Sequence, residues 1–311
     1  MTDKKKSLIY ALTAVLFWST VATAFKLTLL GMNNSQLLFY SSLTSFAVLY
    51  FLAKKNSAGE LKVFFTKQHL INNAFLGMIN PFVYYLILFE AYRILPAQEA
   101  QPINLIWPLI LSIMSAIILK QKLSLSSIFG LVISFVGVVI VATRGNILSF
   151  HFQNITGDLL ALLSSFVWAV YWILNLLDKR EESIKLVGSF FFGTIYTGLY
   201  ILFFDSFGPF EIKYLFGAFY IGLFEMGITF FLWLKAISLS EDKAKTANLV
   251  YLFPVISFSM IAFVLGEKIH MSSVVGLVLI IGGILVQQLS KEIFVANFTA
   301  IKNLFTSKFS R

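Results

Sequence analysis

The stretch Pro108–Gly137 reads PLILSIMSAIILKQKLSLSSIFGLVISFVG, and the stretch Pro254–Gly283 reads PVISFSMIAFVLGEKIHMSSVVGLVLIIGG. Both contain a proline, a Ser-Ser pair and two glycines seven residues apart, at a constant offset of 146 residues. Each joins two long apolar runs through a short polar break. Apolar sequences match easily by chance, but ungapped Pro, Ser-Ser and Gly matches do not. The two halves of the chain are therefore predicted to be copies of one unit.

Apolar runs of this kind continue along the whole chain. A helix needs about 20 apolar residues to cross about 30 Å of hydrocarbon, and ten continuous runs come close to that length. The predicted spans are Ser7–Leu30, Gln36–Ala53, Leu70–Leu95, Ala97–Leu119, Ser126–Thr143, Gly157–Leu177, Leu186–Phe204, Tyr214–Ala236, Ala244–Leu265 and Ser272–Leu289. The sequence therefore predicts an all-α membrane protein with ten transmembrane helices.

The composition excludes the other large classes of protein. Of the 311 residues, 58% are apolar and only 13% are charged, and the mean hydropathy is +0.84. A soluble domain carries about 25% charged residues, while 34 phenylalanines argue against disorder. The chain has no cysteine, which excludes a disulfide scaffold.

The distribution of basic residues predicts the orientation in the membrane. With the N-terminus inside, nineteen of the 24 Lys and Arg residues fall on the inner side. Five fall on the outer side: Lys26, Arg93, Arg144, Lys213 and Lys268. Cytoplasmic loops carry such an excess, so we expect both termini in the cytoplasm of a bacterial-type inner membrane. The net charge of +9 then reflects these loops, and we expect no nucleic-acid partner.

Five spans per copy is an odd number, so the second copy is expected to be inverted relative to the first. We expect one repeat at 7–143, a second at 157–289, and a basic amphipathic cytoplasmic tail at 290–311. Inverted repeats are typical of secondary transporters, whose substrate site lies near the membrane midplane between the copies.

The segments Phe89–Ser124 and Ala247–Val286 resemble the two EamA repeats of the drug/metabolite transporter superfamily, through the proline within a span, the Gly-Glu-Lys motif and the spaced glycines. The stretch INLIWP further resembles the aromatic amino-acid exporter branch, which is YddG-like. One departure is Lys120-Gln121-Lys122 in the first copy, where the second has Gly266-Glu267-Lys268. The resemblance implies a central cavity lined by the first, third, fourth, sixth, eighth and ninth helices, and transport of amino acids or other small metabolites.

Aromatic and polar side chains in the middle of spans are the candidate substrate-binding residues. The aromatic candidates are Trp18, Tyr84, Trp107, Trp168, Tyr171 and Tyr251, with Trp172 beside them, and the polar candidates are Asn80, Gln101, Asn104 and Asn248. Binding pockets are mostly apolar with a few polar groups. The alternative for each aromatic residue is helix packing or lipid contact, and for each amide a hydrogen bond between helices.

Glu225 is the most unusual candidate, because it lies at the centre of the eighth span, where its side chain cannot reach an interface. A charged side chain at this depth costs several kcal/mol unless it is paired, protonated or hydrated. In this part of the repeat the offset is 145 residues, which pairs Gly222 with Gly77 and Glu225 with Asn80. We leave three roles open: binding a cationic group of the substrate, proton coupling, or a structural hydrogen bond.

Other residues in the spans are expected to shape the helices. Spaced glycines are expected to allow close helix packing. Pro81, Pro102, Pro108 and Pro254 are expected to bend their helices, either as static kinks or as hinges beside a cavity.

The charged residues near the outer ends of the spans give three further expectations. Lys26 is expected to extend its ammonium toward the outer interface, Glu90 to pair with Arg93, and Glu99 to be solvated.

The motifs of other function classes are missing from the sequence. It contains no phosphate loop, no HExxH, no GxSxG and no cysteine, and its three histidines lie outside the spans. We therefore expect a protein that is not an enzyme, without cofactor or metal, and with a small-molecule substrate and the lipid bilayer as partners. A monomer is sufficient for this function, and the sequence leaves the oligomeric state open. The favoured function is export of aromatic or apolar amino acids. The alternatives are exchange or import of another amphipathic metabolite, such as S-adenosylmethionine, a nucleoside or a cationic drug, and a channel.

Overall fold

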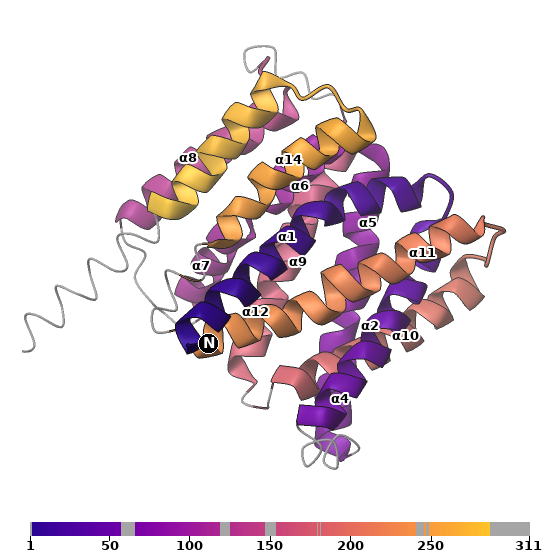
Figure 1. The fold of residues 1–311 in the computed structure, drawn as a ribbon. Coiled ribbons are helices and arrows are strands. Elements are labelled where there is room, and N and C mark those ends of the chain that lie inside the picture. Colours follow the sequence, from indigo (N-terminus) through magenta and orange to yellow (C-terminus); the bar gives the residue numbers. More distant parts are fainter. Residues whose placement is uncertain are drawn as a thin grey trace, which may run out of the picture.

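The computed structural model describes residues 2–56, 66–118, 125–146, 154–178, 180, 182–240, 246 and 249–286. These residues form ten helical segments and no strand, at the positions of the ten predicted spans (Figure 1). The segments are α1 (Asp3–Leu29), α2 (Asn34–Asn56), α4 (Lys67–Gly77) with η1 (Met78–Val83) and α5 (Tyr84–Ile94), α6 (Ala97–Asn104) with α7 (Trp107–Ile118), α8 (Leu125–Ala142), α9 (Ile155–Leu177), α10 (Glu182–Phe204), α11 (Ile212–Ile221) with η3 (Gly222–Gly227) and α12 (Ile228–Leu239), η4 (Leu249–Tyr251) with α14 (Leu252–Leu265), and the last helix, Met271–Val286. The expected amphipathic tail at 290–311 lies outside the described residues.

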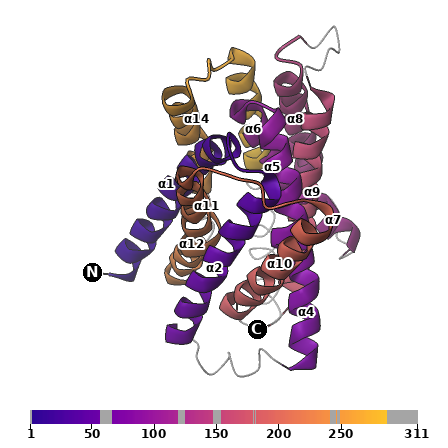
Figure 2. The same cartoon turned by 90° about the vertical axis from the view of Figure 1, so that its right-hand side faces the viewer.

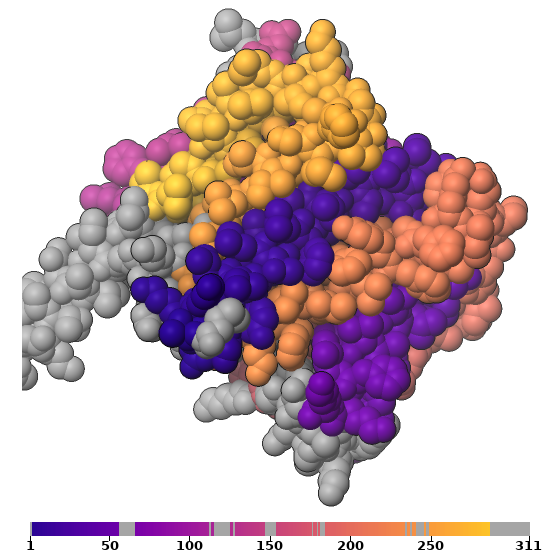
Figure 3. Space-filling view, in the orientation of Figure 1, coloured from indigo at the N-terminus to yellow at the C-terminus, as the bar shows by residue number. Residues whose placement is uncertain are grey.

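The surface of the bundle is apolar, as a lipid-facing surface must be. Six of the helical segments are long and apolar enough to cross a membrane, and three shorter ones are also apolar. Large side chains such as Leu16, Phe216 and Phe263 are exposed, whereas serines such as Ser41 and Ser45 are buried. This distribution is the reverse of that in a soluble domain. Figure 3 shows α14, α1 and α11–α12 crossing one face of this surface.

The first helix of each repeat packs against helices of the other repeat. α1 lies against α11, α12 and α14 of the second repeat, and α9 lies against α5, α6 and α7 of the first. α2 pairs with α10, as Figure 2 also shows. The fold is therefore an all-α membrane protein built from two inverted five-helix repeats. We call α4–α7 with α9 the first unit, and α1, α11, α12 and α14 the second unit.

Glycines make the contact between α8 and the last helix. A Cβ added to Gly137 would lie 2.7 Å from the carbonyl oxygen of Gly276, and one added to Gly283 would overlap the carbonyl oxygen of Gly130. Only glycine permits so close an approach of two backbones. The packing role predicted for these four glycines is confirmed.

Prolines interrupt two spans but not a third. Pro81 cannot donate to the carbonyl of Gly77, and Asn80 before it leaves helical geometry at φ −142° and ψ 123°. Pro108 likewise cannot donate to Asn104, and the fourth span breaks between α6 and α7. Pro254 is the third residue of α14, where the missing N–H costs no helical bond, so the expected bend at this proline is wrong.

The helices of the bundle end at two opposite faces. We call the end at which α1 begins the near face, and the opposite end the far face. The chain turns at the near face between α2 and α4 and between α9 and α10. It turns at the far face between α5 and α6 and between α14 and the last helix.

Candidate substrate-binding site

Eight aromatic side chains from five helices of both repeats meet near the middle depth of the bundle. Trp168 of α9 is central: its ring stacks on Tyr84 with the ring centroids 4.6 Å apart, and on Tyr171 at 5.5 Å. Trp107 and Trp172 stand at right angles to it, at 6.5 and 6.0 Å. We name the whole set, Trp18, Tyr84, Trp107, Trp168, Tyr171, Trp172, Phe230 and Trp233, the aromatic cluster.

Local sequence explains how these rings converge. Trp168, Tyr171 and Trp172 are spaced by three and four residues, so one face of α9 carries all three. Trp107 is the first residue of α7, directly after the break that Pro108 causes. The cluster contains all five tryptophans of the protein.

Amide side chains border the cluster. The Gln101 Nε2 donates to Ser257 Oγ at 3.0 Å, and the Asn104 Nδ2 donates to Ser164 Oγ at 2.8 Å. Among the described residues, the Gln101 Oε1 and the Trp172 Nε1 are buried without a hydrogen-bond partner. These two atoms therefore have unused hydrogen-bonding capacity.

Three further candidates lie apart from this group or outside the described residues. Asn80 is 1% exposed in η1, and its Oδ1 has no partner. Tyr251 ends η4 and packs, half-buried, against the hydrophobic core. Asn248 lies outside the described residues.

Glu225 adjoins the cluster from the second repeat. It lies in η3, is half-buried, and accepts a hydrogen bond of 3.0 Å from the Tyr85 hydroxyl. The Tyr85 ring in turn lies 4.7 Å from the ring of Tyr84. Because this hydrogen-bond partner lies inside the bundle, the carboxylate points inward and not toward lipid.

Sequence reasoning missed three residues of this site: Tyr85, Phe230 and Trp233. Phe230 and Trp233 are three residues apart on α12, and both contact the ring of Trp18. That helical spacing, and the position of Tyr85 beside the chosen Tyr84, were the signals that could have found them.

The two units are joined at the far face. The Glu267 carboxylate accepts the backbone N–H of Ala97 at 3.0 Å and of Gln98 at 3.3 Å, at the start of α6. Unpaired N–H groups at a helix start favour an anion. The Gln98 side chain donates to the Lys268 carbonyl and accepts from the His270 N–H. Thus Glu267, which only the second repeat has, closes the first repeat's fourth helix against the α14 turn.

Lys26 makes a second link at this face. Its Nζ donates to the carbonyl oxygens of Tyr92 and Leu95, both at 2.8 Å. A cation suits the free carbonyls at the end of α5. The Lys26 ammonium therefore lies at the far face, where the last turn of a neighbouring helix binds it.

The acids at the far face differ in their surroundings. Glu90 pairs with Arg93 at 2.5 Å, as predicted. Glu99 is 1% exposed and paired with Arg144 at 2.5 Å, so the prediction that it is solvated is wrong. Asp158, at the start of α9, is also buried, and neither of its carboxylate oxygens has a partner.

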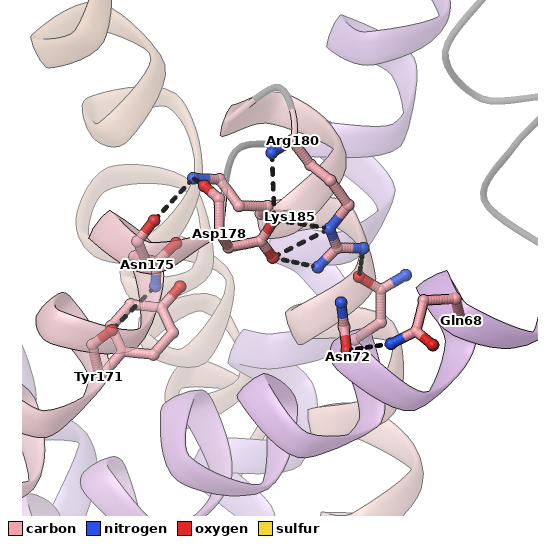
Figure 4. A network of polar contacts seen from close by, with 8 residues as sticks. Gln68, Asn72, Tyr171, Asn175, Asp178, Arg180 and Lys185 are labelled. Carbon is pink, nitrogen blue, oxygen red and sulfur yellow. Dashed lines mark hydrogen bonds and ion pairs between the residues drawn. The ribbon is translucent and has the colours of Figure 1, made fainter.

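A polar network fixes the near-face end of α9 (Figure 4). Arg180 bonds to the Asp178 carboxylate and donates to Asn73 Oδ1 of α4 at 2.7 Å. The buried Lys185 donates to the carbonyls of Asn175 and Asp178 at 3.2 Å. Burial alone would raise the pKa of Asp178, but the hydrogen bonds and charge of Arg180 hold this pKa below its ordinary value. The network therefore ties α9, which carries three rings of the cluster, to α4 and α10.

A model of the EamA-like transporter family matches residues 5–143 and 155–287, one match for each repeat. The chain belongs to the EamA-like transporter family. It is thus a multi-pass membrane transporter of the drug/metabolite transporter superfamily. Among the described residues, no group of three or more His, Asp and Glu side chains is placed to hold a metal.

Relatives of this EamA chain are themselves transporters. An uncharacterized transporter of Archaeoglobus fulgidus is 25% identical over 54% of this chain, and the match spans only 59% of that relative. A second from the same organism is 24% identical over 90% of this chain and 97% of its own. The aromatic amino acid exporter YddG of Ancylobacter novellus is 26% identical over 50% of this chain and 55% of its own.

A solved crystal structure shares the fold of this EamA chain. It superposes with a TM-score of 0.65 at 19% identity, over 94% of this chain and 99% of the other. At that identity the likeness concerns the fold alone.

Proposed function

We propose that this EamA protein is a secondary transporter whose substrate binds at the aromatic cluster, and that aromatic or apolar amino acids are its substrates. The observation that carries the proposal is the convergence of rings from both repeats at mid-depth. Trp18, Phe230 and Trp233 come from the second unit, and Trp168 with its neighbours comes from the first. A solute bound there contacts both units and moves as they move.

The chemistry of the cluster supports an aromatic or apolar solute. Stacked and edge-on rings favour a further ring by about 0.5–1.5 kcal/mol per contact beyond area burial. Gln101 Oε1 and Trp172 Nε1 offer an acceptor and a donor to polar groups of the solute. The resemblance of part of the chain to an aromatic amino acid exporter agrees with this choice.

Alternating access is supported by where the two units join. Every hydrogen bond described between them lies at the far face or at middle depth, at Lys26, Glu267, Gln101 and Glu225. These links leave the near-face ends of the two units to move relative to each other in the proposal, and exchange of shape between inverted repeats would open the site to one face and then to the other.

The distribution of Lys and Arg favours a cytoplasmic near face. Export from the cytoplasm is the proposed direction, in agreement with the partial likeness to an amino acid exporter. The proposed binding residues are Trp18, Tyr84, Gln101, Asn104, Trp107, Trp168, Tyr171 and Glu225. Asn80, Tyr251 and Asn248 remain predicted members of the site. Coupling to protons, the direction of transport and the preferred amino acid are further parts of this proposal.

Counterflow in proteoliposomes tests the proposal. Labelled phenylalanine or tryptophan should accumulate against unlabelled solute inside, with saturation, which a channel does not show. Trp168→Ala should lower the rate at subsaturating solute by about tenfold, since about 1.4 kcal/mol of binding corresponds to tenfold in affinity. Phe51→Ala, which removes an exposed ring from α2, is the matched control and should keep the wild-type rate. Equal rates for both variants, in protein that inserts correctly, would contradict the proposal.

A further inference from the structure

Glu225 is the one acidic side chain that the described residues place at the middle depth of the bundle. The other acids of the described spans lie in the first or last turns of their helices or in the connections between them. Glu225 is half-buried and has one described hydrogen bond, from Tyr85 to Oε1. Its other oxygen therefore has capacity for a further partner.

No basic side chain of the described residues reaches this depth. Lys26 is held by two carbonyls at the far face, and Lys185 by two carbonyls at the near face. Lys235, on the near-face half of α12, lies over the ring of Phe231 at 5.8 Å. The carboxylate thus has no ionic partner within the described protein, and such a charge in a medium of low polarity costs several kcal/mol.

The rings beside Glu225 also favour a positively charged ligand. Tyr85 and Tyr84 are 4.7 Å apart, and Tyr84 stacks on Trp168. The face of an aromatic ring attracts a cation, most strongly for tryptophan. Both the carboxylate and the ring faces therefore attract an ammonium group and repel a carboxylate. The amides Gln101 and Asn104 can bond a carboxylate but cannot neutralise it.

We propose that the site selects its substrate by a free ammonium group bound at Glu225, with an aromatic body in the cluster, and that a carboxylate on the substrate is dispensable. This inference rests on the proposed function, since it assumes that the cluster is the transport site. The preferred class is then an arylalkylamine, the zwitterionic amino acid ranks second, and the aryl carboxylic acid is excluded.

Three solutes of nearly one shape test this order: phenethylamine, phenylalanine and 3-phenylpropionate. Each is added as a competitor of labelled phenylalanine in proteoliposome counterflow at neutral pH. Phenethylamine should compete at least as well as phenylalanine, and 3-phenylpropionate more than about tenfold less well. If 3-phenylpropionate competes equally with the amine, the ammonium inference is overturned. If neither labelled phenylalanine nor labelled phenethylamine shows counterflow, the proposed function itself is wrong, and this outcome differs from a wrong order among the three solutes.

Glu225→Gln separates recognition from other roles of this acid. It should weaken competition by phenethylamine more than about tenfold. Competition by 3-phenylpropionate should stay the same or become stronger, so that the variant no longer prefers the amine to the carboxylic acid. Glu211→Gln is the matched control, because Glu211 is exposed and far from the cluster. Size-exclusion profile and tryptophan emission check that the variant folds. Equal loss for all three solutes would overturn ammonium recognition and assign Glu225 to coupling or to structure.

Discussion

The third and eighth spans depart from α-helix at the same depth, but in different ways. At η1 in the first repeat the helix is kinked, because Asn80 leaves helical geometry, whereas η3 in the second repeat is a continuous π-helical turn. Both departures lie at a glycine that contacts a neighbouring helix: a Cβ on Gly77 would lie 2.6 Å from the Ser189 carbonyl, and one on Gly222 would lie 2.6 Å from the Ser41 carbonyl. π-helical turns are frequent at functional sites.

The side chains at these two turns have diverged. In η1, Asn80 and Pro81 are buried, and the proline packs against Gly193 of α10. In η3 there is no proline, and Glu225 is half-buried beside Tyr85. The two repeats therefore share a departure from α-helix at one depth, but it is a kink in the first repeat and a π-helical turn in the second, and only the second carries an acid there. A site built this way is asymmetric and suits a solute with one charged end.

The largest effect is expected when an acid is introduced into the first repeat, at the position that corresponds to Glu225. Asn80→Asp adds a charge at a fully buried position with no described cation beside it, and should destabilise the protein by about 3–5 kcal/mol. Glu225→Gln, the reverse change in the other repeat, should cost less than about 1 kcal/mol. Thermal unfolding in detergent, followed by tryptophan emission, measures both. An Asn80→Asp variant as stable as wild type would show that the two turns are chemically equivalent.

Substitution of the two glycines tests whether close helix packing is equally important at η1 and at η3. Gly77→Ala and Gly222→Ala should each destabilise the protein by about 1–3 kcal/mol, because each Cβ meets a carbonyl oxygen that cannot move without its helix. Gly282→Ala is the matched control, since nothing lies within 4 Å of its added Cβ. Unequal losses for the first two variants in the same unfolding assay would mean that only one turn depends on close packing.

Tyr85→Phe should have a smaller effect, of about 1 kcal/mol, because it removes one hydrogen bond to Glu225 and no packing. A double-mutant cycle with Glu225→Met isolates that bond, because methionine has a similar length and no comparable acceptor. Stability losses that simply add in the double variant would show that the two side chains do not interact, and that the acid is held in some other way.

The smallest effect concerns the network that steadies the η1 side, where Arg180 reaches Asn73 of α4. The folded protein holds the pKa of Asp178 below its ordinary value, so this acid contributes stability above the unfolded value of about 4. That contribution is lost as pH falls through the folded pKa. Asp178→Asn should therefore lower the unfolding temperature at neutral pH and have little effect near pH 2. A difference that is the same at both pH values would rule out this linkage.

The fold was predictable because the sequence patterns that specify it extend over many residues. Ten apolar runs and a constant repeat offset place the helices and their inversion, and the mid-span tryptophans mark the residues that form the cluster. The failures at Glu99 and Pro254 have different causes: Glu99 depends on a partner far along the chain, and Pro254 on where its helix starts. Arg144 lies 45 residues from Glu99, and no local spacing connects them. The hydrogen bond from Tyr85 to Glu225 spans 140 residues and was likewise beyond local spacing, although the position of Tyr85 beside Tyr84 was a signal for its place in the site.

Binding of phenethylamine to the purified protein, followed by intrinsic tryptophan fluorescence, is a direct test of ammonium recognition at Glu225. All five tryptophans lie in the aromatic cluster, and the ligand contains no indole, so the emission reports this site alone. We expect a saturable change in emission that Glu211→Gln keeps and Glu225→Gln loses. An emission that stays constant over the concentrations at which counterflow saturates, or that changes equally in both variants, would contradict recognition of the ammonium group by this acid.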